Sequence, residues 1–180
     1  MGNDTNRTNK ASPIASLTGH TCPKCVLVAE DDPDDRFMLR RAWKKANLPH
    51  RLVDLADGEQ VIRYLSGSPP FEDRKLYPVP DLLLLDLKMP KLNGFDVLTW
   101  VQGRPELRRL NVLVFSSSSL ESDRQFAVKL GAKAFLTKPN ESSQLVALVS
   151  LLHEYWLANP GALQTSGTEI LTLSGLQSIP

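Results

Sequence analysis

The 180-residue sequence has few cysteines, almost no net charge and no long apolar run. Two cysteines are too few for a disulfide-rich scaffold. No apolar stretch approaches the roughly 18–20 residues that span a bilayer, and the first ten residues lack the apolar segment of a secretory signal. Lys and Arg number 21 against 20 Asp and Glu, so no overall basic field favours nucleic acid or an anionic membrane. We therefore expect a cytoplasmic protein with neither a nucleic-acid nor a membrane partner.

The two cysteines, Cys22 and Cys25, form a C-x-x-C pair. A structural zinc site needs four ligands, and the sequence adds only His20 nearby. A thioredoxin-like motif follows a strand and opens a helix, whereas Cys25 runs directly into the apolar stretch 26–28. We expect two free thiols in an N-terminal arm, with zinc shared between two copies of the chain as the alternative.

Apolar runs typical of strands alternate five times with helical patterns, between polar ends. Residues 1–24 predict a flexible arm and residues 158–180 a C-terminal tail. Strand runs that are apolar on both faces are typical of a parallel sheet with helices on both sides. We predict one α/β domain over residues 25–157, with a doubly wound, five-stranded parallel sheet in three α/β/α layers. The predicted strand–helix pairs are 26–30 with 33–46, 51–56 with 58–65, 81–86 with 95–103, 111–115 with 120–130, and 134–137 with 142–156.

Two segments depart from the ordinary pattern. The last helix carries apolar residues around most of its circumference, which predicts a second burial surface against the C-terminal tail or a second copy of the chain. We therefore expect a homodimer through this helix. The connection 66–80 is unusually long, and such loops are often functional or mobile. His20, His50 and His153 show no spacing that pairs them, so we expect no phosphotransfer histidine within the chain.

Polar residues follow the strands at the edge where ligands bind in open parallel sheets. Glu30 and Asp31 follow the first strand, Asp86 the third, Ser116 the fourth and Lys138 the fifth. Neighbouring carboxylates repel one another unless a cation offsets their charge. Because the site offers oxygen ligands and no His or Cys, it favours Mg²⁺ or Mn²⁺.

The same constellation fits phosphoryl transfer. A divalent ion, the Lys138 ammonium and the Ser116 hydroxyl would bind the three oxygens of a phosphoryl group. Asp86 is nearest the centre, so it is the natural nucleophile and would form an aspartyl phosphate. The sequence has no nucleotide-binding loop of the Walker or Rossmann type, so we expect the phosphoryl donor to be a separate molecule.

Residues 26–156 closely resemble the receiver domain of two-component response regulators. The resemblance implies the flavodoxin-like strand order 2-1-3-4-5. It also implies that Asp86 is the phosphoacceptor and that Lys138 clamps the phosphoryl oxygens. Glu30, Asp31, Asp86 and the backbone carbonyl of Lys88 would hold the metal, and Ser116 and Phe135 would be the switch residues. The segments that carry the resemblance are Glu30–Pro33, Asp81–Pro90, Asn93–Gly94, Ser116–Ser117, Leu130–Ala132 and Lys138–Pro139.

This resemblance implies a single-domain response regulator, similar to those paired with bacterial phytochrome kinases. A histidine kinase or phosphotransfer protein would phosphorylate Asp86, and the surface around the fourth and fifth helices would then act on a downstream protein that the sequence does not identify. The chain would be a phosphoacceptor rather than a turnover enzyme. A phosphatase of the haloacid-dehalogenase type would need a second Asp at position 88, which is Lys. The alternative is a scaffold that works without phosphorylation.

Overall fold

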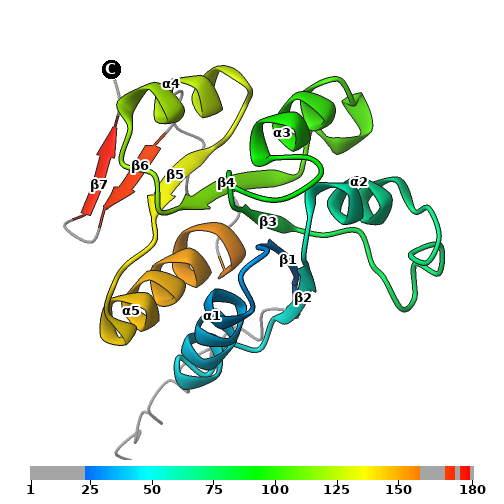
Figure 1. Ribbon diagram of the computed structural model, residues 1–180. Coiled ribbons are helices and arrows are strands. Elements are labelled where there is room, and N and C mark those ends of the chain that lie inside the picture. Colours follow the sequence, from blue (N-terminus) through cyan, green and yellow to red (C-terminus); the bar gives the residue numbers. More distant parts are fainter. Residues whose placement is uncertain (1–22, 159–168, 173–174, 179–180) are drawn as a thin grey trace, which may run out of the picture.

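Five βα units build a three-layer arrangement in the computed structural model, which describes residues 23–158, 169–172 and 175–178 (Figure 1). The expectations placed on residues 1–22, including Cys22 and His20, lie outside the described residues. A short 3-10 helix, Pro105–Leu107, precedes the fourth strand, and a π-helical turn, His153–Ala158, follows the fifth α-helix. The main elements are β1 Cys25–Ala29, α1 Pro33–Lys45, β2 Arg51–Leu55, α2 Gly58–Ser66, β3 Leu82–Leu85, α3 Gly94–Gln102, β4 Asn111–Ser116, α4 Glu121–Lys129, β5 Ala134–Thr137 and α5 Ser142–Leu152.

The sheet confirms the predicted parallel order β2-β1-β3-β4-β5. Every residue of β1 and β3 is buried, because helices cover both faces of the sheet. One apolar cluster joins the sheet to α1 and α5, and the other joins it to α2, α3 and α4 (Figure 1). The strand ends that carry the polar residues therefore meet at one edge. Among the described helices, none combines the length and apolarity needed to cross a membrane.

The segment expected to be a C-terminal tail contains two strands. β6, Glu169–Thr172, pairs parallel to β5, with Ala134 opposite Glu169. β7, Gly175–Ser178, pairs antiparallel to β6. Without β6, β5 would be an edge strand, whose unpaired backbone groups offer hydrogen bonds to a further strand.

The long connection after α2 is packed rather than loose. Phe71 and Tyr77 lie with their ring centroids 5.1 and 6.0 Å from that of Tyr64, on α2. Arg74 donates to the carbonyl oxygens of Tyr64 and Leu65, at 2.9 and 3.0 Å, where α2 ends. These contacts anchor the connection to the helix that precedes it.

Cys25 does not belong to an exposed arm. It is the first residue of β1 and is buried, and its Sγ lies 3.7 Å from the hydroxyl of Tyr64. Burial raises the pKa of the Cys25 thiol. Cys25 is thus a free cysteine, as expected, but its expected place in the N-terminal arm is wrong, because it packs in the sheet as a small apolar side chain.

Candidate functional site

The backbone of the sheet places the expected polar residues side by side. The amide of Glu30 donates to the carbonyl of Leu55 at 3.0 Å, and the amide of Asp86 donates to that of Ala29 at 2.9 Å. The amide of Lys138 donates to the carbonyl of Ser116 at 3.0 Å. The ladder hydrogen bonds thus continue just past the strand ends and hold three of these residues in register.

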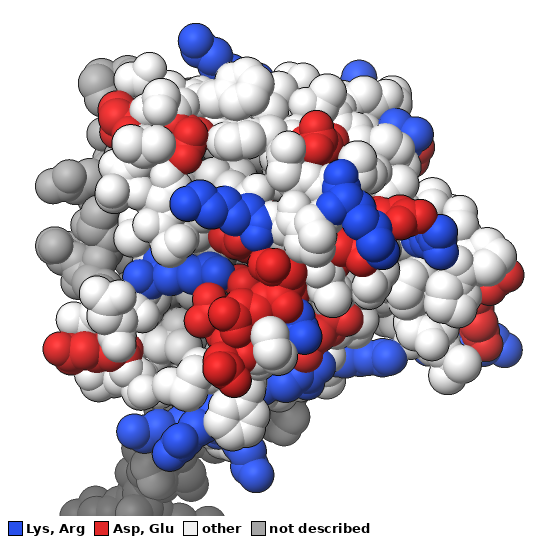
Figure 2. All heavy atoms as spheres, in the orientation of Figure 1, with Lys and Arg blue, Asp and Glu red and all other residues white. Residues whose placement is uncertain are grey.

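Three carboxylates converge at this edge. Glu30, Asp31 and Asp86 each offer an oxygen, and the three oxygens lie within 4.8 Å of one another. Glu30 and Asp86 are buried, whereas Asp31 is exposed. Figure 2 shows acidic side chains gathered near the centre of this face, with Lys and Arg side chains around them. The all-oxygen donor set suits Mg²⁺ or Mn²⁺, as the sequence predicted.

The crowding of negative charge in the cluster affects the pKa of Glu30. Burial, reinforced by the neighbouring charge of Asp86, raises the pKa of Glu30 to about 6, although its bond to Lys138 acts in the opposite direction. The protein alone therefore does not fully compensate this carboxylate. A divalent cation between the three oxygens would supply the missing charge.

Lys138 is the cation that the protein itself provides. Its Nζ contacts the carboxylate of Glu30, lies 2.8 Å from Asp35 Oδ2, and lies 3.7 Å from Asp86 Oδ1. Burial favours the neutral amine, but the hydrogen bonds to Asp35 and Glu30 outweigh it and raise the pKa of Lys138. The ammonium therefore stays charged beside Asp86.

Ser116 and Phe135 lie in the interior next to this edge. Ser116 ends β4, is fully buried, and accepts a long hydrogen bond from the amide of Ser118 at 3.5 Å. Phe135, on β5, is only 2% exposed, and the Arg124 guanidinium of α4 lies 5.1 Å from its ring centroid. The aromatic side chain therefore points inward.

Lys88 contributes through its backbone. Its side chain is exposed, and its amide donates to Asp86 Oδ2 at 2.9 Å. This bond orients the carboxylate of Asp86 and leaves its other oxygen toward Lys138.

The sequence predicted no supporting role for two residues near the site. The Arg36 guanidinium donates to the carbonyl oxygens of Glu30 and Asp31, at 2.5 and 2.9 Å, and so fixes the backbone of the acidic segment. A Cβ at Gly94 would lie 2.4 Å from the carbonyl oxygen of Asp86, so only glycine fits there without a shift. The Asn93–Gly94 pair was a usable signal for this close approach, whereas Arg36 had none.

The arrangement combines an oriented, buried carboxylate with two further carboxylates that could hold a metal and with a fixed ammonium. Such a site favours an incoming group that carries dispersed negative charge, provided that a divalent cation is bound. Phosphoryl transfer has this requirement, because it depends on positioning and charge neutralisation more than on covalent help from the protein.

Comparisons with known proteins agree with this chemistry. The sequence profile of the response regulator receiver domain matches residues 26–150. Response regulator Rcp1 of Synechocystis is 31% identical over 135 residues, which cover 75% of this chain and 90% of that protein. A structure of the Mn²⁺-bound form of Rcp1 matches 75% of this chain and 95% of that chain with a TM-score of 0.67, at 31% identity.

Two further solved structures are similar over most of the chain. The phosphorylated cyanobacterial phytochrome response regulator RcpA is 31% identical, with a TM-score of 0.71 over 77% of this chain and 96% of that one. Response regulator RPA3017, in red light signalling of R. palustris, is 34% identical, with a TM-score of 0.72 over 81% of this chain and all of that one. The predicted fold class is confirmed by these similarities.

Proposed function

The chain belongs to the response regulator receiver domain family, and on that premise we propose that Asp86 is its phosphoacceptor. The observation that carries this assignment is the position of Asp86, buried among Glu30, Asp31 and the Lys138 ammonium. In the reaction, the N–P bond of a phosphohistidine breaks as a bond forms from phosphorus to an Asp86 carboxylate oxygen. The histidine nitrogen leaves with the electron pair of the broken bond.

We propose that Mg²⁺, or Mn²⁺ in its place, is held by Glu30, Asp31, Asp86 and the backbone carbonyl of Lys88. When bound, the metal supplies positive charge for the phosphoryl oxygens. Lys138, whose Nζ lies 3.7 Å from Asp86 Oδ1, would supply a second positive charge to the phosphoryl oxygens. The Mn²⁺-bound structure of Rcp1 supports this choice of ion.

Ser116 and Phe135 are proposed as the switch. The Ser116 hydroxyl, at the end of β4, would donate to a phosphoryl oxygen, and Phe135 would mark the active state by its packing. Phe135 has no hydroxyl with which to bond at the surface, so packing alone distinguishes its positions. The altered surface would comprise α4, β5 and α5, because Phe135 lies on β5 beneath Arg124 of α4.

We propose a histidine kinase or phosphotransfer protein as the donor and a separate protein as the target. The similarity to RcpA and RPA3017 favours a kinase of the phytochrome type. In this proposal the chain is a cytoplasmic phosphoacceptor rather than a turnover enzyme, and residues 25–157 form the receiver domain. The segment 1–24 would precede it, and β6 and β7 of the segment 158–180 extend its sheet.

We also propose a homodimer through α5. Ala147 is exposed on this helix, and Val146 and Leu151 are half-buried, as are Tyr155 and Trp156 of the π-helical turn that follows it. The described part of the chain leaves this apolar surface partly open to a second copy. Sedimentation with and without beryllofluoride tests the proposal, and monomers at high concentration in both conditions would remove it.

Intact-mass spectrometry tests the phosphoacceptor directly. The protein is incubated with Mg²⁺ and a small phosphodonor, and wild type is compared with Asp86→Asn and with Asp96→Asn, which removes an exposed carboxylate of α3. We expect one phosphoryl adduct in wild type and Asp96→Asn, and none in Asp86→Asn or without Mg²⁺. No adduct in any variant, where a control receiver labels, would favour a scaffold that works without phosphorylation.

A further inference from the structure

The Lys138 ammonium lies nearer to α1 than to the proposed phosphoacceptor. Its Nζ is 2.8 Å from Asp35 Oδ2 but 3.7 Å from Asp86 Oδ1. The bond to Asp35 joins residues 103 positions apart in the chain. The residue that should clamp the phosphoryl group is therefore already engaged by a carboxylate outside the metal cluster.

The N-terminus of α1 already has a capping side chain. Asp32 caps α1, and its side chain accepts from the amides of Asp34 and Asp35. The carboxylate of Asp35 instead reaches across to Lys138. Its side chain is 46% exposed, whereas that of Lys138 is 15% exposed, so the bond lies at the solvent boundary of the site.

We propose that Asp35 is a positioning residue that competes with the phosphoryl group for Lys138, an inference that rests on the proposed role of Asp86. Phosphorylation places close to two negative charges and new acceptor oxygens on Asp86. Lys138 must then bond the phosphoryl oxygens, and the contact with Asp35 is given up or weakened. Asp35 thus favours the unphosphorylated arrangement.

The expected size follows from the exposure of Asp35. Ion pairs with one partner in water are weak and screened by salt, and such pairs correspond to about a two- to fivefold change in an equilibrium constant. Removing the charge of Asp35 should therefore tighten binding of a phosphoryl group by this factor. The metal ligands remain in place, since Asp35 is not among the three clustered carboxylates.

Beryllofluoride binding in the presence of Mg²⁺ measures this competition, with fluorine NMR as the readout. Asp35→Asn removes the competing charge, and Asp35→Glu keeps it. Asp34→Asn is the matched control, because it removes the same charge from the same helical turn and Asp34 has no ion pair in the described structure. Thermal unfolding of each variant without beryllofluoride reports whether the fold is preserved.

We expect Asp35→Asn to bind beryllofluoride about two- to fivefold more tightly than wild type, Asp34→Asn to match wild type, and Asp35→Glu to restore weaker binding. The advantage of Asp35→Asn should shrink as salt rises from about 50 mM to about 500 mM. Equal affinities for Asp35→Asn and Asp34→Asn, or weaker binding by Asp35→Asn, would overturn the inference alone. Failure of wild type to bind beryllofluoride would overturn the proposed function and this inference with it.

Discussion

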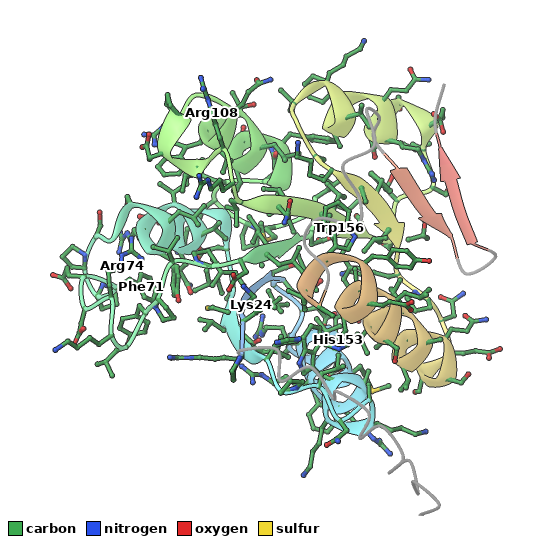
Figure 3. The ribbon with its side chains drawn as sticks, turned by 180° about the vertical axis from the view of Figure 1, so that it is seen from behind. Lys24, Phe71, Arg74, Arg108, His153 and Trp156 are labelled. Atoms are coloured by element: carbon green, nitrogen blue, oxygen red, sulfur yellow. The ribbon has the colours of Figure 1, made fainter. Side chains whose placement is uncertain are left out.

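His50 and His153 form a hydrogen bond, with His50 Nε2 lying 2.8 Å from His153 Nδ1. The Lys24 amide donates to His50 Nδ1 at 3.1 Å, so this nitrogen carries no proton and His50 Nε2 is the donor to His153. The chain thus ties the start of β1 and the α1–β2 connection to the end of α5, near Lys24 and His153 in Figure 3. The sequence spacing of these histidines gave no sign of this pair, which the fold brings together across 103 residues.

This pair predicts a loss of stability in mild acid. Burial lowers the pKa of His50, and the positive charges of His153 and Lys24 act in the same direction. A histidine with a lowered folded-state pKa binds fewer protons than in the unfolded chain, so its contribution is present above about pH 6.5 and lost as the pH falls below it. We expect the free energy of unfolding, measured by urea denaturation with EDTA, to fall between about pH 7 and about pH 5.

The variant His50→Gln should weaken this pH dependence while also lowering stability at pH 7. His20→Gln serves as the control for the loss of one histidine and should keep the wild-type profile. An unchanged pH profile in His50→Gln would show that other groups cause the acid destabilisation.

The carboxylate cluster predicts opposite effects of one substitution with and without metal. Because the pKa of Glu30 is raised to about 6, its contribution to stability is present below about pH 4.5 and is lost as the pH rises through 6. Glu30→Gln should therefore stabilise the metal-free protein at pH 7 by about 1–2 kcal/mol. The same variant should lose most of the stabilisation that Mg²⁺ gives wild type.

Thermal unfolding with EDTA tests the expected stabilisation of the metal-free protein. The same measurement across a Mg²⁺ titration tests the expected loss of stabilisation by the metal. Glu72→Gln, which removes an exposed carboxylate with no ion pair in the described part of the chain, should behave as wild type in each. Destabilisation of the metal-free protein by Glu30→Gln would show that its bond to Lys138 outweighs the cost of the crowded charge.

The close approach of α3 to Asp86 predicts that Gly94→Ala is destabilising. Its Cβ would meet the Asp86 carbonyl oxygen at 2.4 Å and Leu87 Cα at 2.9 Å, and both are backbone atoms that cannot move aside cheaply. We expect a loss of about 1–3 kcal/mol in the free energy of unfolding. Gly103→Ala is the control, since its Cβ would meet nothing nearer than 3.8 Å and its φ is −73°. Equal urea midpoints for both variants would contradict the crowding seen at Gly94.

The packed connection after α2 predicts a structural role for Arg74. Its guanidinium satisfies the carbonyls of Tyr64 and Leu65 at the end of α2, and also reaches that of Tyr77 at 3.3 Å (Figure 3). Arg74→Met should cost about 1–3 kcal/mol, because these carbonyls lose a charged donor.

Arg63→Met is the matched control for the loss of an arginine. Arg63 pairs only with the exposed Glu59 on the same helix, and this pair should contribute less than about 0.5 kcal/mol. Hydrogen exchange should also speed up in residues 67–80 of Arg74→Met. Similar stability and exchange in the two variants would show that the aromatic cluster alone holds the connection.

The fold was predictable because its signals are local. Runs such as Leu82–Leu85 are apolar on both faces, and α1 begins with Asp32 and Pro33, which marks its start. The metal cluster was also predictable, since parallel strands bring their carboxyl ends to one edge. The helix predicted over 142–156 stops being α-helical after Leu152.

The features that were not predicted depend on contacts between distant segments. In the sequence, Asp35 is one of several acidic residues at the start of a helix. Nothing near it in the sequence indicated its contact with Lys138, 103 residues away. His50 and His153 are separated by the same interval. The strands β6 and β7 have only four residues each, so their pairing depends on the edge that β5 would otherwise expose rather than on a strong pattern of their own.

The pairing of β6 with β5 restricts how freely β5 can move. β5 is the strand that carries Phe135 and leads to Lys138. In a five-stranded sheet β5 would be a border strand, free on one side to shift when the site changes. Here β4 and β6 flank it, with Ala134 paired to Glu169 on the outer side. A displacement of β5 would therefore be passed outward to the β6–β7 hairpin, which would give the proposed switch a second route to the surface besides α4 and α5.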